Sequence, residues 1–155
     1  MQNNEELVDA LNELVRINYD RVFGYELAIE DVENTDVDLK AVFSKYADQS
    51  REYVTHWQQT ITSLGGEPVA DSTVRGKLFR VWMDFKATLT GKSRQSMLDS
   101  CEFGEGAAQR AYQEALETDA HLPDNIRQEI AEQKAELKSS HDSIRDAARL
   151  HDQMN

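Results

Sequence analysis

The sequence has one cysteine and few of the residues that favour turns. The single Cys101 excludes an intramolecular disulfide. Seven glycines and two prolines are too few for an all-β protein with many turns. Glu, Lys, Gln, Leu and Ala fill the periodic segments instead, which favours helices. The composition predicts an all-α protein, and 155 residues are sized for a single domain, residues 1–155.

Long apolar runs are also missing. No window approaches the roughly 18 to 20 apolar residues that span a bilayer. The start, MQNNEELVDA, lacks the basic and apolar regions of a secretory signal. We therefore expect a cytoplasmic protein that does not enter a membrane. Its formal net charge of -12 repels phosphate backbones, which argues against nucleic acid as a partner.

Apolar residues recur at three- and four-residue steps in four long segments, which predicts helices over about 4–33, 36–64, 93–118 and 123–151. On the first segment we expect an inner stripe of Leu7, Leu11, Leu14, Val22, Tyr25, Ile29 and Val32. Asn3 and Thr35 are suitable capping residues, and Gly65 with Gly66 stops the second helix. The segment 72–91 predicts a shorter helix, which we term the crossover.

The order of these segments predicts how they pack. A short connection at Asn34 and Thr35 makes the first two helices antiparallel neighbours, and the crossover then separates them from a second long pair. This is the connectivity of a ferritin-like up-down four-helix bundle with a shorter crossover helix between the second and third long helices. An up-down-up-down bundle decorated by the crossover is the alternative.

The stretch CEFGEGA at residues 101–107 contains an unexpected charge. Glu105 falls on the apolar stripe of the third long helix, with Cys101, Ala108 and Tyr112. An ionised carboxylate facing a core needs a partner. Lys134, or His141 together with Tyr46, could serve as that partner.

A metal is the other way to balance such a charge. At about 1.5 Å per residue, a group of polar residues from four helices reaches a similar height in the bundle: Glu26, Gln49, Glu102, Glu105 and His141. Carboxylates and imidazoles are suitable ligands for iron or manganese. However, di-iron bundles carry two Glu-x-x-His pairs, and this chain has neither. A metal-free polar network is therefore the favoured interpretation, with no cofactor.

The crossover is apolar over more than one stripe's width. Phe79, Trp82 and Met83 belong to this broad surface. One face would cover the bundle and the other a second subunit, which predicts a homo-oligomer. Wrapping by the loop at 65–72 is the alternative.

Several blocks resemble a known group of proteins. The most specific are GKLFRVWMDFKATLTG and CEFGEGAAQRAY, and INYDRVFGYELAIED, LKAVFSKYADQSREY, LGGEP and LKSSHDSIR match as well. Together they are similar to a bacterial family of ferritin-like four-helix bundles that is known as a domain of unknown function. The resemblance implies the ferritin-like fold and no agreed substrate.

Two functional hypotheses follow. The first is a non-enzymatic, cytoplasmic, ferritin-like bundle whose inner polar cluster is structural, with a stress association only by analogy. The second is an iron or manganese protein that uses the five candidate ligands for oxidase or storage chemistry. A DNA-protecting mini-ferritin is a third possibility, but MQNNEE lacks a basic extension.

Overall fold

The computed structural model describes residues 2–31, 37–70 and 93–154. They form four α-helices: α1 Gln2–Asp31, α2 Val37–Ser63, α4 Ser93–Leu116 and α5 Asp124–Met154. The predicted all-α class is confirmed, and each long helix lies within a few residues of its predicted bounds.

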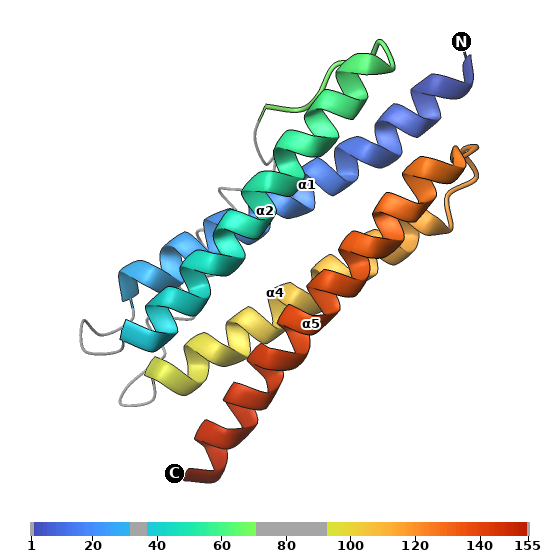
Figure 1. The fold of residues 1–155 in the computed structure, drawn as a ribbon. Coiled ribbons are helices and arrows are strands. Elements are labelled where there is room, and N and C mark those ends of the chain that lie inside the picture. Colours follow the sequence, from blue (N-terminus) through green and yellow to red (C-terminus); the bar gives the residue numbers. More distant parts are fainter. Residues whose placement is uncertain (1, 32–36, 71–92, 155) are drawn as a thin grey trace.

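The helices form two antiparallel hairpins (Figure 1). We call α1 with α2 the first hairpin and α4 with α5 the second hairpin. Helix α1 packs on α4, and α2 faces α5 through longer side chains. Figure 1 shows that α2 and α4 run in the same direction, so the end of α2 and the start of α4 lie at opposite ends of the bundle. This confirms the ferritin-like connectivity and excludes the up-down-up-down alternative.

Two glycines end α2. Gly65 has a positive φ of 82°, and the amides of Gly65 and Gly66 donate to the carbonyls of Thr62 and Ile61, both at 3.0 Å. This pair of bonds is a Schellman motif, which suits glycine because an L side chain strains at positive φ. The chain that follows is held on α1 by Asn12, whose amide donates to Glu67 O at 3.1 Å and whose oxygen accepts from Val69 N at 2.9 Å. The Asn12 contacts thus fix the direction in which the chain leaves α2.

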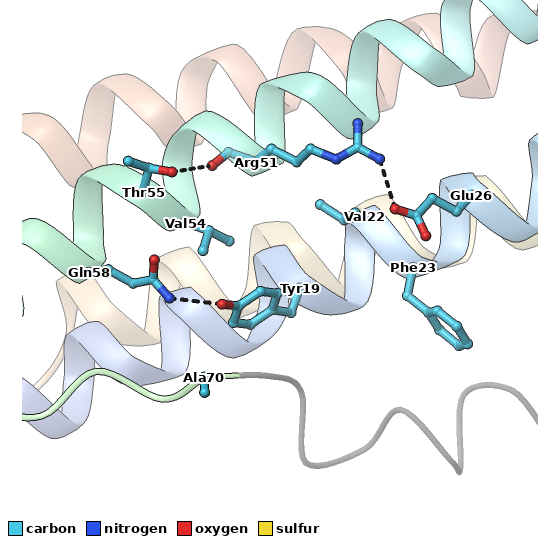
Figure 2. Close-up of a pocket in the computed structure, with 9 residues that line it drawn as sticks. All are labelled: Tyr19, Val22, Phe23, Glu26, Arg51, Val54, Thr55, Gln58 and Ala70. Atoms are coloured by element: carbon cyan, nitrogen blue, oxygen red, sulfur yellow. Dashed lines mark hydrogen bonds and ion pairs between the residues drawn. The ribbon is translucent and has the colours of Figure 1, made fainter.

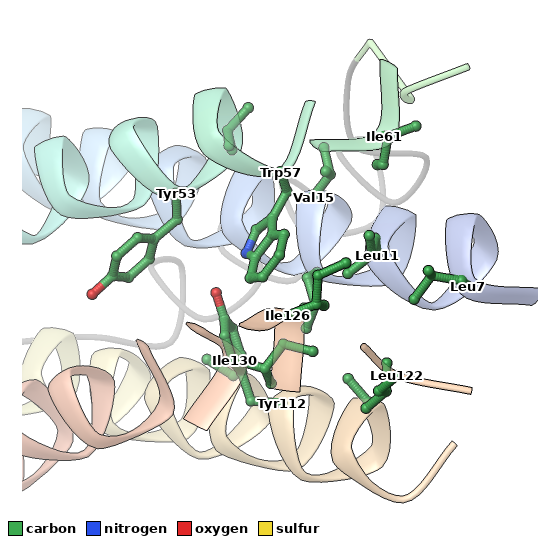
Figure 3. Packing of buried hydrophobic residues seen from close by; sticks show 14 of the residues in the cluster. Leu7, Leu11, Val15, Tyr53, Trp57, Ile61, Tyr112, Leu122, Ile126 and Ile130 are labelled. Atoms are coloured by element: carbon green, nitrogen blue, oxygen red, sulfur yellow. The ribbon is translucent and has the colours of Figure 1, made fainter. Parts of the chain in front are cut away.

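The apolar core falls into two clusters. The larger one joins the N-terminal half of α1 to the C-terminal half of α2 and to the second hairpin (Figure 3). Its largest fully buried members are Trp57 and Tyr112, which lie between the two hairpins. The smaller cluster surrounds Phe43, Leu98 and Ile144 nearer the other end of the bundle. Hydrophobic burial of this kind drives the association of the four helices.

A layer of polar residues separates the two clusters. On every helix a buried polar side chain lies between the residues of one cluster and those of the other: Asn18 and Arg21 on α1, Ser50 on α2, Glu105 on α4 and Ser140 on α5. Because all four helices contribute, the layer crosses the whole bundle. We call this set the polar layer.

Some expectations lie outside the described residues. They include the turn at 34–35, the crossover helix over 72–91 and the oligomer contacts of Phe79, Trp82 and Met83. Within the described part of the chain, no helix is both long enough and apolar enough to cross a membrane.

Gly66 provides a test of the packing after α2. A Cβ at this position would lie 2.6 Å from Cγ2 of Val8, so we expect Gly66→Ala to lower the free energy of unfolding by about 1–3 kcal/mol. Gly104→Ala is the control, because a Cβ there meets no atom within 4 Å and alanine favours the helix by about 1 kcal/mol. Urea unfolding measures both, and equal effects of the two substitutions would contradict this account.

Candidate functional site

Among the α4 side chains that the structure describes, Glu105 is the most deeply buried charged one. Its relative exposure is 1%, and Cys101, Ala108 and Tyr112 are buried on the same face of the helix. The sequence-based expectation that this carboxylate faces the core is confirmed. A carboxylate removed from water in this way costs several kcal/mol unless it is paired.

The partner of Glu105 is Arg21 of α1. The Nε and Nη2 groups of Arg21 donate to the two carboxylate oxygens, with 3.1 Å between Nη2 and Oε2. The side chains are 3% and 1% exposed. Such two-pronged, charge-assisted contacts are among the strongest hydrogen bonds in proteins. The partners suggested from the sequence, Lys134 or His141 with Tyr46, were therefore wrong. The partner is a residue of α1 instead.

The rest of the guanidinium is also surrounded. Arg21 Nη1 donates to the backbone oxygen of Tyr46 at 3.0 Å and to Ser50 Oγ at 2.8 Å. Its central carbon lies 5.3 Å from the ring centre of Tyr25 and 5.5 Å from that of Tyr46, within the range of cation–π attraction. Burial by itself lowers the pKa of Arg21, but the charge and hydrogen bonds of Glu105 outweigh it and the pKa is raised. The guanidinium therefore stays charged inside the bundle.

Hydrogen bonds continue from Arg21 through the bundle. Ser50 Oγ donates to Asn18 Oδ1 at 2.8 Å, and Asn18 Nδ2 donates to the Tyr112 hydroxyl oxygen at 2.9 Å. The Tyr112 hydroxyl donates in turn to Gln133 Oε1 at 2.6 Å, which also accepts from Trp57 Nε1 at 2.8 Å. An arginine can only donate, so every hydroxyl and amide along this path has one orientation.

Two further polar groups lie beside Glu105. The Tyr25 hydroxyl is buried and has no hydrogen-bond partner among the described residues. Burial, with the nearby Glu105 charge, raises the pKa of Tyr25 well above its ordinary value. The same two causes raise the pKa of the Cys101 thiol. Both groups stay protonated at neutral pH, which makes Cys101 a poor nucleophile.

The other predicted ligands lie nearer the surface than Glu105. Glu26, Gln49, Glu102 and His141 are all partly exposed. Arg51 Nη2 pairs with Glu26 at 2.8 Å, and Ser140 Oγ donates to Gln49 at 3.3 Å. Over residues 2–31, 37–70 and 93–154, no group of three His, Cys, Asp or Glu side chains is placed to hold a metal.

The pairing of Glu105 with Arg21 also argues against Glu105 as a metal ligand. Both carboxylate oxygens accept hydrogen bonds from Arg21, and the positive charge beside them would repel a metal cation. A di-iron site needs several carboxylates and imidazoles directed at one point. The described residues do not fit such a centre.

Sequence reasoning missed Arg21 because it followed a different stripe. Apart from Asn12 and Val15, the buried positions of α1 recur at alternating steps of four and three residues: Leu7, Leu11, Leu14, Asn18, Arg21, Tyr25 and Ala28. This is the 3.5-residue period of a coiled-coil seam. The predicted stripe used Val22 and Ile29 instead, and both are only partly buried. A strict heptad count would have placed Arg21 inside.

A cleft lies on the outer side of α1 and α2 (Figure 2). Its volume is about 450 Å³, and Val22, Val54 and the ion pair of Arg51 with Glu26 line it. Gln58 Nε2 donates to the Tyr19 hydroxyl at 2.8 Å in the same cleft. Its charged groups thus neutralise one another, and the cleft is separate from the polar layer.

Comparisons with known proteins agree with this fold. A family model described as Domain of unknown function (DUF2383) matches residues 6–118. A structure from Bacteroides fragilis, described as a dodecameric thioferritin and bacterioferritin-related protein, has a TM-score of 0.77 at 20% identity over 97% of this chain and 89% of that one.

A second similar structure, from Bacillus anthracis str. Ames, is described as one of the ferritin-like, diiron-carboxylate proteins. Its TM-score is 0.62 at 16% identity, over 99% of this chain and 98% of that chain. None of the curated proteins compared with the chain matches it. At these identities the structural likeness concerns the fold alone.

The unpaired Tyr25 hydroxyl predicts that its removal does not lower the stability of the protein. Because an unpaired buried donor costs about 1–3 kcal/mol, we expect Tyr25→Phe to leave the free energy of unfolding unchanged or to raise it. Tyr53→Phe is the control, because the Tyr53 hydroxyl donates to Glu136 at 3.0 Å and its loss should destabilise by about 1–3 kcal/mol. Urea unfolding would contradict this assignment if Tyr25→Phe destabilised as much as Tyr53→Phe.

The buried ion pair predicts strong coupling between its partners. Arg21→Met or Glu105→Leu alone leaves one uncompensated buried charge and should lower the free energy of unfolding by about 3–5 kcal/mol. The double variant contains no buried charge and should recover most of this loss. Equilibrium urea unfolding gives the four values of the cycle.

The pair of Arg51 and Glu26 is the matched control, because its side chains are 47% and 44% exposed. We expect Arg51→Met and Glu26→Leu to change stability by about 1 kcal/mol or less. Additive losses in the cycle of Arg21 and Glu105 would show that the two residues do not act as a pair.

Proposed function

Because the chain belongs to the DUF2383 family and has a ferritin-like fold, we propose that it is a non-enzymatic ferritin-like bundle whose inner polar layer is structural. The observation that carries this proposal is the pairing of Glu105 with Arg21 inside the bundle. In a diiron-carboxylate protein, metal ions balance the inner carboxylates. Here a side chain of the protein supplies that positive charge.

The polar layer has features of a structural element. Four of its members, Asn18, Arg21, Ser50 and Glu105, are joined by hydrogen bonds, and its two largest side chains, Arg21 and Glu105, are buried on opposite hairpins. A reactive centre needs an accessible acid, base or nucleophile with a suitable pKa. Glu105 is engaged by a permanent cation, while Cys101 and Tyr25 hold their protons. These properties favour support of the helices over catalysis.

The same proposal covers the domain organisation, the location and the assembly of the protein. We include a single domain over residues 1–155, a cytoplasmic location and assembly from several copies. A similar structure is described as dodecameric, which supports assembly without specifying the number of subunits. The expected role of Phe79, Trp82 and Met83 in that assembly rests on the sequence alone.

A metal-binding function is the competing candidate, because another similar structure is described as a diiron-carboxylate protein. In that case Glu26, Gln49, Glu102, Glu105 and His141 would bind iron or manganese. Such binding would require Glu105 to leave Arg21. The cost of exposing or stranding the guanidinium opposes this exchange.

Metal analysis separates the two candidates. We expect protein purified without a chelator to contain far less than one iron or manganese per chain, and added Fe²⁺ or Mn²⁺ to leave the Tm unchanged, since a ligand stabilises only a protein that binds it. His141→Ala is the control variant, because His141 is partly exposed and the substitution removes a candidate ligand. Near-stoichiometric metal that is lost in His141→Ala would refute the structural proposal.

A further inference from the structure

Donors and acceptors of the side-chain hydrogen bonds between the two hairpins are unequally divided. Among the described residues, the first hairpin donates most of the side-chain hydrogen bonds that cross between the hairpins. The donors are Asn18, Arg21, Tyr53, His56 and Trp57, and their acceptors are Tyr112, Glu105, Glu136, Glu129 and Gln133 respectively. One bond runs the other way, from Ser140 to Gln49. The first hairpin thus presents mostly donors and the second mostly acceptors.

Charged side chains at the interface are also divided between the two hairpins. The buried cation, Arg21, belongs to the first hairpin, and the carboxylate paired with it, Glu105, belongs to the second. Glu136 and Glu129, which accept from Tyr53 and His56 of the first hairpin, also belong to the second. Two copies of the first hairpin packed together would bury two Arg21 guanidinium groups without a Glu105 carboxylate to balance them. Two copies of the second would bury two Glu105 carboxylates without an Arg21 to balance them. Both arrangements bury like charges, which is costly.

The apolar clusters do not make this distinction. Both hairpins contribute leucine, isoleucine and tyrosine or tryptophan to the core, and such surfaces pack with many partners. Specificity requires contacts that penalise the wrong partner. In this interface the penalty comes from the polar layer.

We infer that the first hairpin recognises any second hairpin with a matching inner charge, including that of a second copy of this chain, so that two copies can exchange hairpins reciprocally. In the exchanged pair, Arg21 of each copy meets Glu105 contributed by the other. The contacts between the described parts of the two hairpins are recreated, which is why exchange of identical elements costs little. The interaction surface is the inner face of each hairpin, and its partner is a second copy.

The test uses two full-length chains, Arg21→Met and Glu105→Leu. Each chain alone must pair a charged inner face with an apolar one. Exchange between them produces one bundle with Arg21 facing Glu105 and one in which the two introduced apolar side chains face each other, so that both are matched. Equal amounts are unfolded in urea, mixed and refolded together, and the urea midpoint is compared with that of each chain refolded alone.

We expect the mixture to unfold near the midpoints of the wild type and of the double variant, well above both single variants. Native mass spectrometry should find the two chains in a 1:1 species. Ordinary association through outer surfaces would not raise the midpoint, because the mismatches inside each bundle would persist.

Arg21→Met mixed with the wild type is the control. Exchange there always leaves one introduced methionine facing Glu105, so we expect no rescue. The inference is overturned if the main mixture unfolds as the sum of its two components, if the control is rescued equally, or if either single variant unfolds at the wild-type midpoint. Metal content is measured separately, so a failure here is distinct from a failure of the structural function proposed above.

Discussion

The pairing of Arg21 with Glu105 is the constraint on which the interior of this bundle depends. Each ion alone would cost several kcal/mol to bury. Two hydrogen bonds between them, two more from Arg21 to Tyr46 O and Ser50, and the faces of two tyrosine rings offset that cost. Apolar residues could fill the same volume equally well. We therefore expect the pair to contribute more to specificity than to net stability.

The hydrogen bonds that begin at this pair constrain the alignment of all four helices. Arg21 only donates, so Ser50 must donate onward to Asn18, and Asn18 must turn its amide toward Tyr112. A helix that slipped by one residue would break several of these bonds at once. A single polar residue in a helical seam sets register in the same way. The two apolar clusters supply the driving force, and the polar layer between them selects the alignment.

The inner charge also bears on what a ferritin-like fold does in this chain. Fold alone does not imply function, which depends on the site that the fold carries. A structure similar to this one is described as a diiron-carboxylate protein, whereas here the buried carboxylate is bonded to a guanidinium. The partly exposed Glu26 is paired with Arg51 on the outer side. Helices of the same arrangement thus surround a different kind of interior.

The sequence by itself determined the helices, their order and the burial of Glu105, because these follow from local periodicity and from the lengths of the connections. It did not determine the partner of Glu105. Residues 21 and 105 belong to different helices, and a small error in the phase of one stripe exchanged Arg21 for Val22. Only the tertiary structure decided which side chains meet, since the rotation of each helix about its axis depends on packing against all the others at once.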